Sequence, residues 1–340
     1  MAATMVAGLV GGWLFFIADI PLAWMLGAMT ICTLAALARL PVKGPEPLWA
    51  TTAAILGVML GSGFSPDILD QASRWPVTMA GLVVFVGLAG TISVLFLRHV
   101  GKFDATTAYF AGMPGGISEM MLVGREAGGD MRKIALCHAA RIFLVVFTIP
   151  FVVTVGGHEM SADMVASGLP SVAETSAFEW LWLAACALAG AIVGRVLRLP
   201  AKYFLGPMLV SAVVHAGGFS DFTPPAEVVI LAQVVLGTIV GCRFAGAAPR
   251  EILFILALSL GSTGMVLVVT LGMAAIVGEL SGQGFLPVLL AYSPGGLMEM
   301  SLVALALNVE ITFVAVHHLV RVIFVMFTAP LLFKALKRRG

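Results

Sequence analysis

At residues 111–120 the chain reads Ala-Gly-Met-Pro-Gly-Gly-Ile-Ser-Glu-Met, and at residues 291–300 it reads Ala-Tyr-Ser-Pro-Gly-Gly-Leu-Met-Glu-Met. The two stretches lie 180 residues apart, and each places a Pro-Gly-Gly triplet and a carboxylate inside an apolar segment. Proline removes a backbone donor and glycine tolerates positive φ, so a helix should stop and restart at each triplet. A duplicated break of this kind predicts a site built where two repeats meet.

The composition predicts an all-α polytopic membrane protein whose main partner is the lipid bilayer. Of the 340 residues, 60% are hydrophobic and 11% are charged, and the mean hydropathy is +1.05. Soluble domains carry about 25% charged residues. Apolar runs of about 20 residues recur along the chain, for example at 76–97 and 311–332. The net charge of +1 does not give the excess of positive charge that is typical of nucleic-acid-binding proteins.

The duplication covers nearly the whole chain. Identical residues recur at a spacing of 179 near the start and 180 afterwards, as in the Leu-Gly pairs at 26–27 and 205–206 and at 56–57 and 236–237. Matches kept in register over such a distance indicate an internal repeat. We therefore predict a first repeat at 1–155, a polar linker at 156–176 and a second repeat at 177–340.

The positive charges predict the topology. Each copy has six apolar segments, and if all twelve crossed the membrane, the 17 Lys and Arg other than Arg141 and Arg321 would divide 9 to 8 between the two sides. If the fifth segment of each copy returns to its own side, they divide 16 to 1, with only Arg74 outside. This predicts ten spans, two re-entrant elements, both termini inside and a second repeat inverted relative to the first. In an alternative, the broken segment crosses and another segment does not.

The two breaks should meet inside the protein, because irregular backbone at membrane depth must be buried or line a wet cavity. A restarted helix exposes unpaired N–H groups that attract anions. The predicted substrate cradle consists of Pro114, Gly115, Gly116, Pro294, Gly295 and Gly296. The structural alternative is a tight turn that lets helices pack closely.

Glu119 and Glu299 lie in the first turn of the restarted helices. A carboxylate there is favoured by the helix dipole, which makes a simple capping role one interpretation. An intramembrane carboxylate is costly, however, and is by default functional. The second interpretation is that each carboxylate carries a coupled proton or binds a cation.

Each motif is followed by a His and an Arg one helical turn apart, His138 with Arg141 and His318 with Arg321. A buried Arg stays charged and must find an anion. One interpretation is substrate binding; the other is an ion pair, with Glu119 or Glu299 or with the corresponding residues Asp130 and Glu310. A His changes charge near neutral pH, so His138 and His318 are further candidates for proton coupling. Adjacent His317 has no counterpart, since Cys137 fills its position.

No cofactor or metal is expected. The four cysteines, Cys32, Cys137, Cys186 and Cys242, have neither metal-ligand nor redox spacing.

The chain resembles the AbrB family of bacterial inner-membrane proteins with two AbrB duplication domains. The resemblance rests on the stretch at 199–207, its partner at 20–28, the two Pro-Gly-Gly-x-x-Glu-Met motifs and the two His-x-x-Arg pairs. It implies a multi-pass protein of the inner membrane, and the family carries labels of ammonia monooxygenase and of gene-expression regulator. More distantly, the expected architecture is similar to the cation/proton antiporter and anion transporter superfamily.

The residues favour a secondary transporter of a small, anionic organic solute over an enzyme. The alternative is a membrane regulator that senses a ligand, with the basic tail at 334–339 as the only candidate output surface. A monooxygenase is disfavoured because copper or iron oxidation needs clustered His and carboxylate ligands, and none is evident. A homo-oligomer is compatible with the sequence, which does not specify one.

Overall fold

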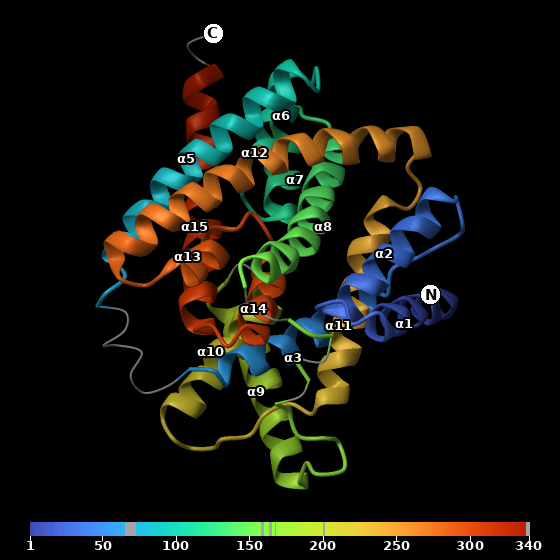
Figure 1. Ribbon diagram of the computed structural model, residues 1–340, viewed down its shortest axis with the longest axis vertical. Helices are drawn as coiled ribbons and strands as arrows, with labels where there is room; N and C mark the ends of the chain where they lie inside the picture. Colours follow the sequence, from blue (N-terminus) through green and yellow to red (C-terminus); the bar gives the residue numbers. More distant parts are fainter. Residues whose placement is uncertain (65–72, 158–159, 163–164, 167, 200, 338–340) are drawn as a thin grey trace. The chain divides into compact units, whose positions relative to one another are not determined.

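The computed structural model describes residues 1–64, 73–157, 160–162, 165–166, 168–199 and 201–337, and these residues form helices without strands (Figure 1). The helices are α1 (Ala2–Ile17), α2 (Ala23–Leu37), η1 (Glu46–Leu48), α3 (Trp49–Gly61), α5 (Pro76–His99), α6 (Ala105–Gly112), α7 (Ile117–Glu126), α8 (Met131–Val155), α9 (Ala177–Val196), α10 (Lys202–Ala216), α11 (Ala226–Gly241), η2 (Cys242–Phe244), α12 (Pro249–Ser281), α13 (Phe285–Tyr292), α14 (Leu297–Ala306) and α15 (Ile311–Lys337). Pro200, the linker acids Glu159 and Asp163, and Arg338 and Arg339 of the tail lie outside the described residues.

Six described helices are long and apolar enough to cross a membrane: α5, α8, α9, α11 with η2, α12 and α15. The other four predicted spans correspond to α1, α2, α3 and α10, which have 16, 15, 13 and 15 residues. A 15-residue helix is about 22 Å long, shorter than the roughly 30 Å hydrocarbon core. Length and composition therefore give six candidate spans among the described residues, and the total of ten stays a prediction.

The fifth segment of each copy is broken as predicted. Residues 113–116 separate α6 from α7, and residues 293–296 separate α13 from α14. In the first copy the end of α7 lies beside the first turn of α6, since the Asp130 backbone N–H donates to Oγ1 of Thr107 at 2.9 Å. A Cβ at Gly124 on α7 would lie 3.2 Å from Cβ of Phe110 on α6. Helices α6 and α7 thus form a hairpin, and its entry and return on one face of the membrane stay a prediction.

The chain forms two compact units, and neither equals a sequence repeat. The first comprises Met1–Ser73, Ile149–Gly246 and Ser301–Thr312, and the second comprises Arg74–Thr148, Ala247–Met300 and Phe313–Gly340. Each unit takes segments from both predicted repeats. All residues of the predicted site belong to the second unit.

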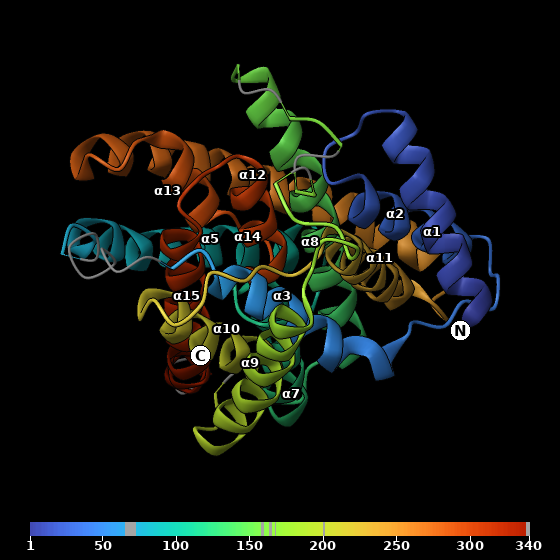
Figure 2. The same ribbon diagram turned by 90° about the horizontal axis from the view of Figure 1, so that it is seen from below.

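The first unit is held by close helix crossings at glycines that recur at the repeat spacing. Gly11 and Gly27 bring α1 against α2 backbone to backbone, and Gly190 and Gly206 do the same for α9 and α10. Figure 2 shows α1, α2 and α11 packed together. Such contacts exclude any side chain, which is why small residues line helix interfaces in membranes.

The third helix of each copy packs on the second helix of the other. Gly57 of α3 lies against the carbonyl oxygen of Phe204 in α10, while Gly237 of α11 lies against that of Met25 in α2. Residues 57 and 237 correspond, as do 25 and 204. A reciprocal contact of this kind is what a twofold relation between two copies produces.

The backbone repeats in detail as well. Positive φ angles occur at five pairs of corresponding positions: Asp19 and Arg198, Leu22 and Ala201, Arg39 and Gly218, Lys102 and Gly282, and Gly128 and Asn308. Residues other than glycine rarely adopt such angles. Their recurrence at spacings of 179 and 180 indicates that the two copies fold alike at these turns.

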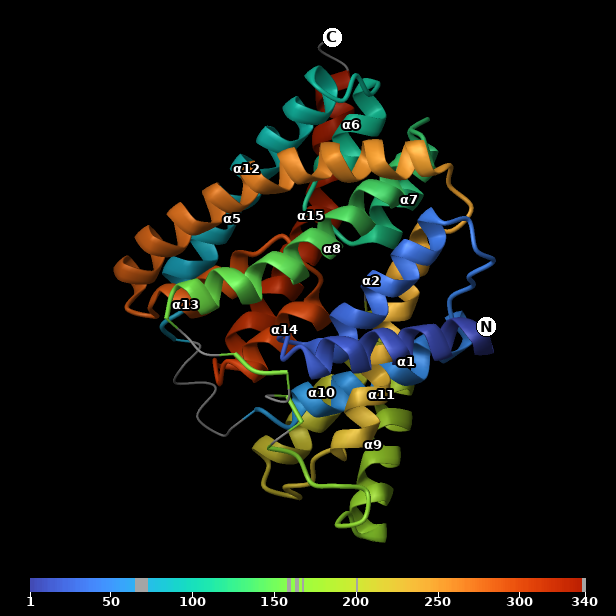
Figure 3. The same cartoon turned by 45° about the vertical axis from the view of Figure 1, so that its right-hand side comes forward.

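In the second unit α5 and α12 run side by side (Figures 1 and 3). They are antiparallel, since Gly81 lies beside Val277 and Gly101 lies beside Leu258. Helix α6 packs on α5, and α13 packs on α12. The two long helices therefore form a frame that carries both broken elements.

Candidate functional site

The first break is held by α8. Nε2 of His138 lies 2.9 Å from the carbonyl oxygen of Phe110, in the last turn of α6. Nη1 of Arg141 donates to the carbonyl of Met113 at 3.2 Å, and its Nη2 donates to Nδ1 of His138 at 2.8 Å. The His-x-x-Arg pair thus satisfies carbonyls that the break leaves without helical partners.

The second break is held by α15 in the same way. Nε2 of His318 lies 2.9 Å from the carbonyl oxygen of Leu290, and Nη1 of Arg321 donates to the carbonyl of Ser293 at 2.6 Å. Nη2 of Arg321 donates to Nδ1 of His318 at 3.0 Å and to the carbonyl of Gly295 at 2.8 Å. The residues involved correspond to those of the first break at a spacing of 180, and only the Gly295 bond is additional.

These bonds fix both histidines in the neutral state. A carbonyl oxygen only accepts, so Nε2 of His138 and of His318 must carry its hydrogen. A guanidinium only donates, so Nδ1 of each ring must accept. Taking up a second proton would break the bond to the arginine, and the geometry therefore favours a positioning role over proton coupling for the two histidines.

The arginines do not form the ion pairs that the sequence offered as an alternative. Arg141 and Arg321 are buried, and within the described part of the chain neither has a carboxylate within ion-pair distance. Asp130 instead accepts from the backbone N–H groups of Arg132 and Lys133. Nε of Arg141 and Nε of Arg321 are buried and make no hydrogen bond. Both guanidinium groups thus retain an unused donor and an uncompensated positive charge.

The two breaks lie close together along α15. Arg321 bonds the second break, and four residues further on Val325 packs against the first, where a Cβ at Gly115 would lie 3.0 Å from Cγ1 of Val325. Four residues correspond to about 6 Å of helix. The structure thus brings the two predicted half-sites together within one unit.

Glu119 and Glu299 fold back over the glycine at the start of their own helices. Oε2 of Glu119 occupies the space that a side chain at Gly116 would need, and Oε2 of Glu299 does the same at Gly296. Glu299 is 6% exposed, and Glu119 is partly buried. Each carboxylate therefore lies at a helix N-terminus, where the dipole favours negative charge.

Among the described residues, the second break has a polar cluster that the first lacks and that the sequence did not predict. Nε2 of His317 lies 2.8 Å from Oγ1 of Thr78, and its Nδ1 lies 2.7 Å from the carbonyl oxygen of Phe313. The hydroxyl of Tyr292 donates to the carbonyl of Thr78. Cys137 and Gly112 replace His317 and Tyr292 in the first copy. The unmatched His317 was the one signal of this asymmetry in the sequence.

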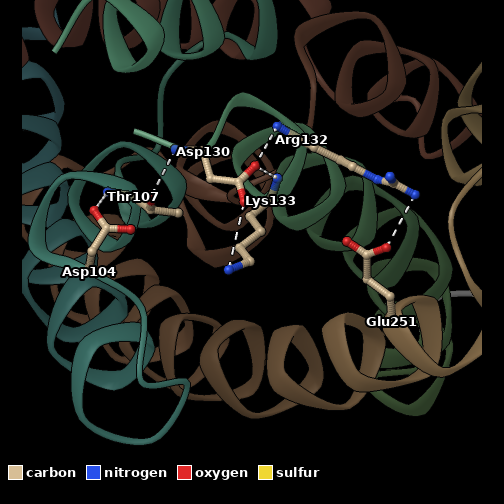
Figure 4. A network of polar contacts seen from close by, with 6 residues as sticks. All are labelled: Asp104, Thr107, Asp130, Arg132, Lys133 and Glu251. Carbon is tan, nitrogen blue, oxygen red and sulfur yellow. Dashed lines mark hydrogen bonds and ion pairs between the residues drawn. The ribbon is translucent and has the colours of Figure 1, made fainter. Parts of the chain in front are cut away.

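The entry and exit of the first hairpin are joined by a chain of polar contacts (Figure 4). Oδ1 of Asp104 accepts from the N–H of Thr107, whose hydroxyl in turn accepts from the N–H of Asp130. Lys133 approaches Asp130 at 3.7 Å, and Arg132 pairs with Glu251 on α12 at 3.2 Å. Gly284 replaces Asp104 in the second copy, and α13 begins without a side-chain cap.

Replacing Asp104 with alanine should lower stability by about 1 kcal/mol, because α6 loses its N-cap. Partial burial tends to raise the pKa of Asp104, but hydrogen bonds from Thr107 and from the backbone N–H groups beside it together outweigh this effect and leave the pKa below its ordinary value. Because the pKa is lowered in the folded state, the carboxylate stabilises that state at pH values above the ordinary aspartate pKa. This contribution to stability disappears as the pH falls through the folded-state pKa. Thermal unfolding in detergent should show a difference at neutral pH that closes in acid. The exposed Glu126→Ala variant is the control and should change stability by less than about 0.5 kcal/mol.

With this geometry established, comparison with known proteins adds the family. The family described as "Transition state regulatory protein AbrB" matches residues 24–337. The chain belongs to the AbrB family. The match spans both breaks and both His-x-x-Arg pairs, so the site described above lies within the family's own region.

Two relatives of this AbrB-family chain are similar over nearly full length. One is "Uncharacterized protein YhjN" of Bacillus subtilis (strain 168), 28% identical over 96% of this chain and 90% of the relative. The other is "Putative regulator AbrB" of Escherichia coli (strain K12), 24% identical over 93% of this chain and 90% of the relative.

Among the described residues, no group of three or more His, Cys, Asp or Glu could hold a metal ion.

Proposed function

We propose that this protein is a secondary transporter of a small anionic organic solute in the bacterial cytoplasmic membrane. One observation carries the proposal: two buried arginines lie at two adjacent helix breaks, each with a free Nε–H and no carboxylate partner among the described residues. A buried unpaired charge costs several kcal/mol. A bound anion would remove that cost and use both free donors.

Inverted repeats are part of the proposal, with both termini on the cytoplasmic side. The first hairpin packs toward the C-terminal end of α5, where Gly112 lies beside Val94, while Tyr292 at the second break bonds Thr78 near the N-terminal end. The two broken elements thus reach α5 from opposite ends. This supports a solute site at the meeting point, opened to the two faces in turn.

Proton coupling is assigned to Glu119 and Glu299 rather than to the histidines. The carboxylates lie at the breaks without a cationic partner among the described residues, whereas both ring nitrogens of His138 and His318 are engaged. If one glutamate takes up a proton for each negative charge of the bound solute, the net charge of the site does not change.

A thermal-shift screen of the detergent-solubilised protein tests the class of solute. We expect small carboxylates to raise the unfolding temperature and amines of the same size to have no effect, because the free donors at the breaks are cationic. Amino acids test whether a carboxylate is sufficient when the same molecule also carries an ammonium group, since they have both charges. Stabilisation by amines alone would contradict a site that binds anions.

The relatives' names favour one second candidate, a membrane-bound regulator. It would use the same residues at the two breaks for sensing and would need an output surface, for which the chain offers the basic tail at 334–339. Deleting the tail separates the two functions. Lost regulation of target genes with intact ligand binding would favour a sensor, whereas unchanged solute uptake and unchanged expression would favour the transporter.

A further inference from the structure

Each helix that restarts after a break begins with an anion site that the protein already occupies. The first N–H groups of a helix have no intrahelical partner and carry the positive end of the dipole. At α7 and α14, both ten residues long, the carboxylates of Glu119 and Glu299 lie over the preceding glycines. A substrate anion that used these N-termini would meet an internal carboxylate there.

Each break also has a buried arginine beside it, which is a second and independent observation. Arg321 bonds Gly295, directly before Gly296, and Arg141 bonds Met113 at the start of the first break. Both are buried, and each directs bonds to the break while its Nε–H stays unused. Each break therefore has a buried guanidinium with one donor that no group of the described protein uses.

We propose that Glu119 and Glu299 are tethered competitors of the substrate anion, and that a proton couples to transport by displacing them. This rests on the proposed function. An ionised glutamate holds the helix N-terminus and excludes the substrate. Protonation removes its charge, weakens its hold on the dipole and frees the N–H groups and the arginines for the substrate. Proton and anion therefore load together, and loss of the proton restores the carboxylate and expels the anion.

The other titratable groups near the breaks do not produce the same dependence. Arginine keeps its charge between pH 6 and pH 8, and the two histidines bonded to the arginines are held neutral. The groups concerned are His138 and Arg141 on α8, His317, His318 and Arg321 on α15, and Tyr292 on α13. His317 alone among them has an uncharged partner at each nitrogen, so His317→Gln belongs in the test as a second variant.

The test measures binding of acetate, lactate, succinate and benzoate to the full-length protein in detergent, at pH 6 and pH 8 and constant ionic strength. For the wild type we expect affinity to fall by about tenfold per pH unit for each coupled proton. Glu119→Gln with Glu299→Gln should bind equally at both pH values and more tightly than wild type at pH 8, because glutamine has the shape without the competing charge. Glu251→Gln, in the surface pair with Arg132, is the control and should behave as wild type.

Each outcome decides a separate point. Tighter binding at pH 8 in the variants Glu119→Gln and Glu299→Gln supports competition, since a structural role of the glutamates predicts only weaker binding. An unchanged pH dependence in these two variants overturns the competition but does not contradict a site that binds anions. A pH dependence that disappears in His317→Gln instead assigns the proton elsewhere and also overturns it. Binding of no carboxylate by any variant at either pH contradicts the proposed function itself.

Discussion

Replacing Arg321 with alanine should reduce uptake of the anionic solute by at least about 30-fold in proteoliposomes. The variant loses a cation that the site offers to the substrate, and a desolvated charge contact of this kind contributes about 2–5 kcal/mol. It also leaves the carbonyls of Ser293 and Gly295 without their donor. Arg141→Ala should be less severe for the fold, because Arg141 bonds a single break carbonyl, that of Met113.

Folding must be separated from function in this comparison. Size-exclusion profiles and unfolding temperatures are measured for each variant before uptake. Arg132→Ala is the matched control, because its partner Glu251 and its own side chain are partly exposed. Exposed ion pairs contribute about 0–1 kcal/mol, so uptake should change less than about twofold. Wild-type uptake by a folded Arg321→Ala variant would remove this residue from the site.

Replacing Gly27 with valine should prevent accumulation of folded protein. A Cβ at Gly27 would collide with the carbonyl of Gly11, and this contact is backbone on both sides, so no side chain can move away. Forcing helices apart at such a crossing costs about 3 kcal/mol or more. The corresponding substitution, Gly206→Val, meets Gly190 in the same way and should have the same effect.

Fluorescence-detected size exclusion of the expressed variants measures this effect. Gly272→Ala in α12 is the control, since a Cβ there would meet no atom within 4 Å. Alanine is the better helix former by about 1 kcal/mol, so this control should be neutral or stabilising. A normal monodisperse peak for Gly27→Val would mean that the α1–α2 crossing is looser than described.

The break residues were predictable because their chemistry is local. A Pro-Gly-Gly triplet stops a helix wherever it occurs, and its repetition marked the second copy. The segments that became α5, α8, α12 and α15 were predictable for a similar reason, since long apolar runs have few alternatives in a bilayer.

The partners of the charged residues were not predictable. The sequence offered Glu119 and Asp130 as anions for Arg141, but the arginine bonds backbone carbonyls, which every residue carries and no pattern reveals. The mixing of both repeats within each compact unit is likewise a long-range effect. It follows from crossings such as that of Gly57 with Phe204, whose partners lie far apart in the chain.

Proton movement driven by a carboxylate in proteoliposomes tests the central claim most directly. The purified protein is reconstituted with a pH-sensitive dye in the lumen, and the carboxylates that raise the unfolding temperature are added outside. We predict acidification of the lumen that requires the carboxylate, is absent with Arg321→Ala and persists with Arg132→Ala. Carboxylate-independent acidification, or equal rates in wild type and Arg321→Ala, would contradict an anion transporter built on these two helix breaks.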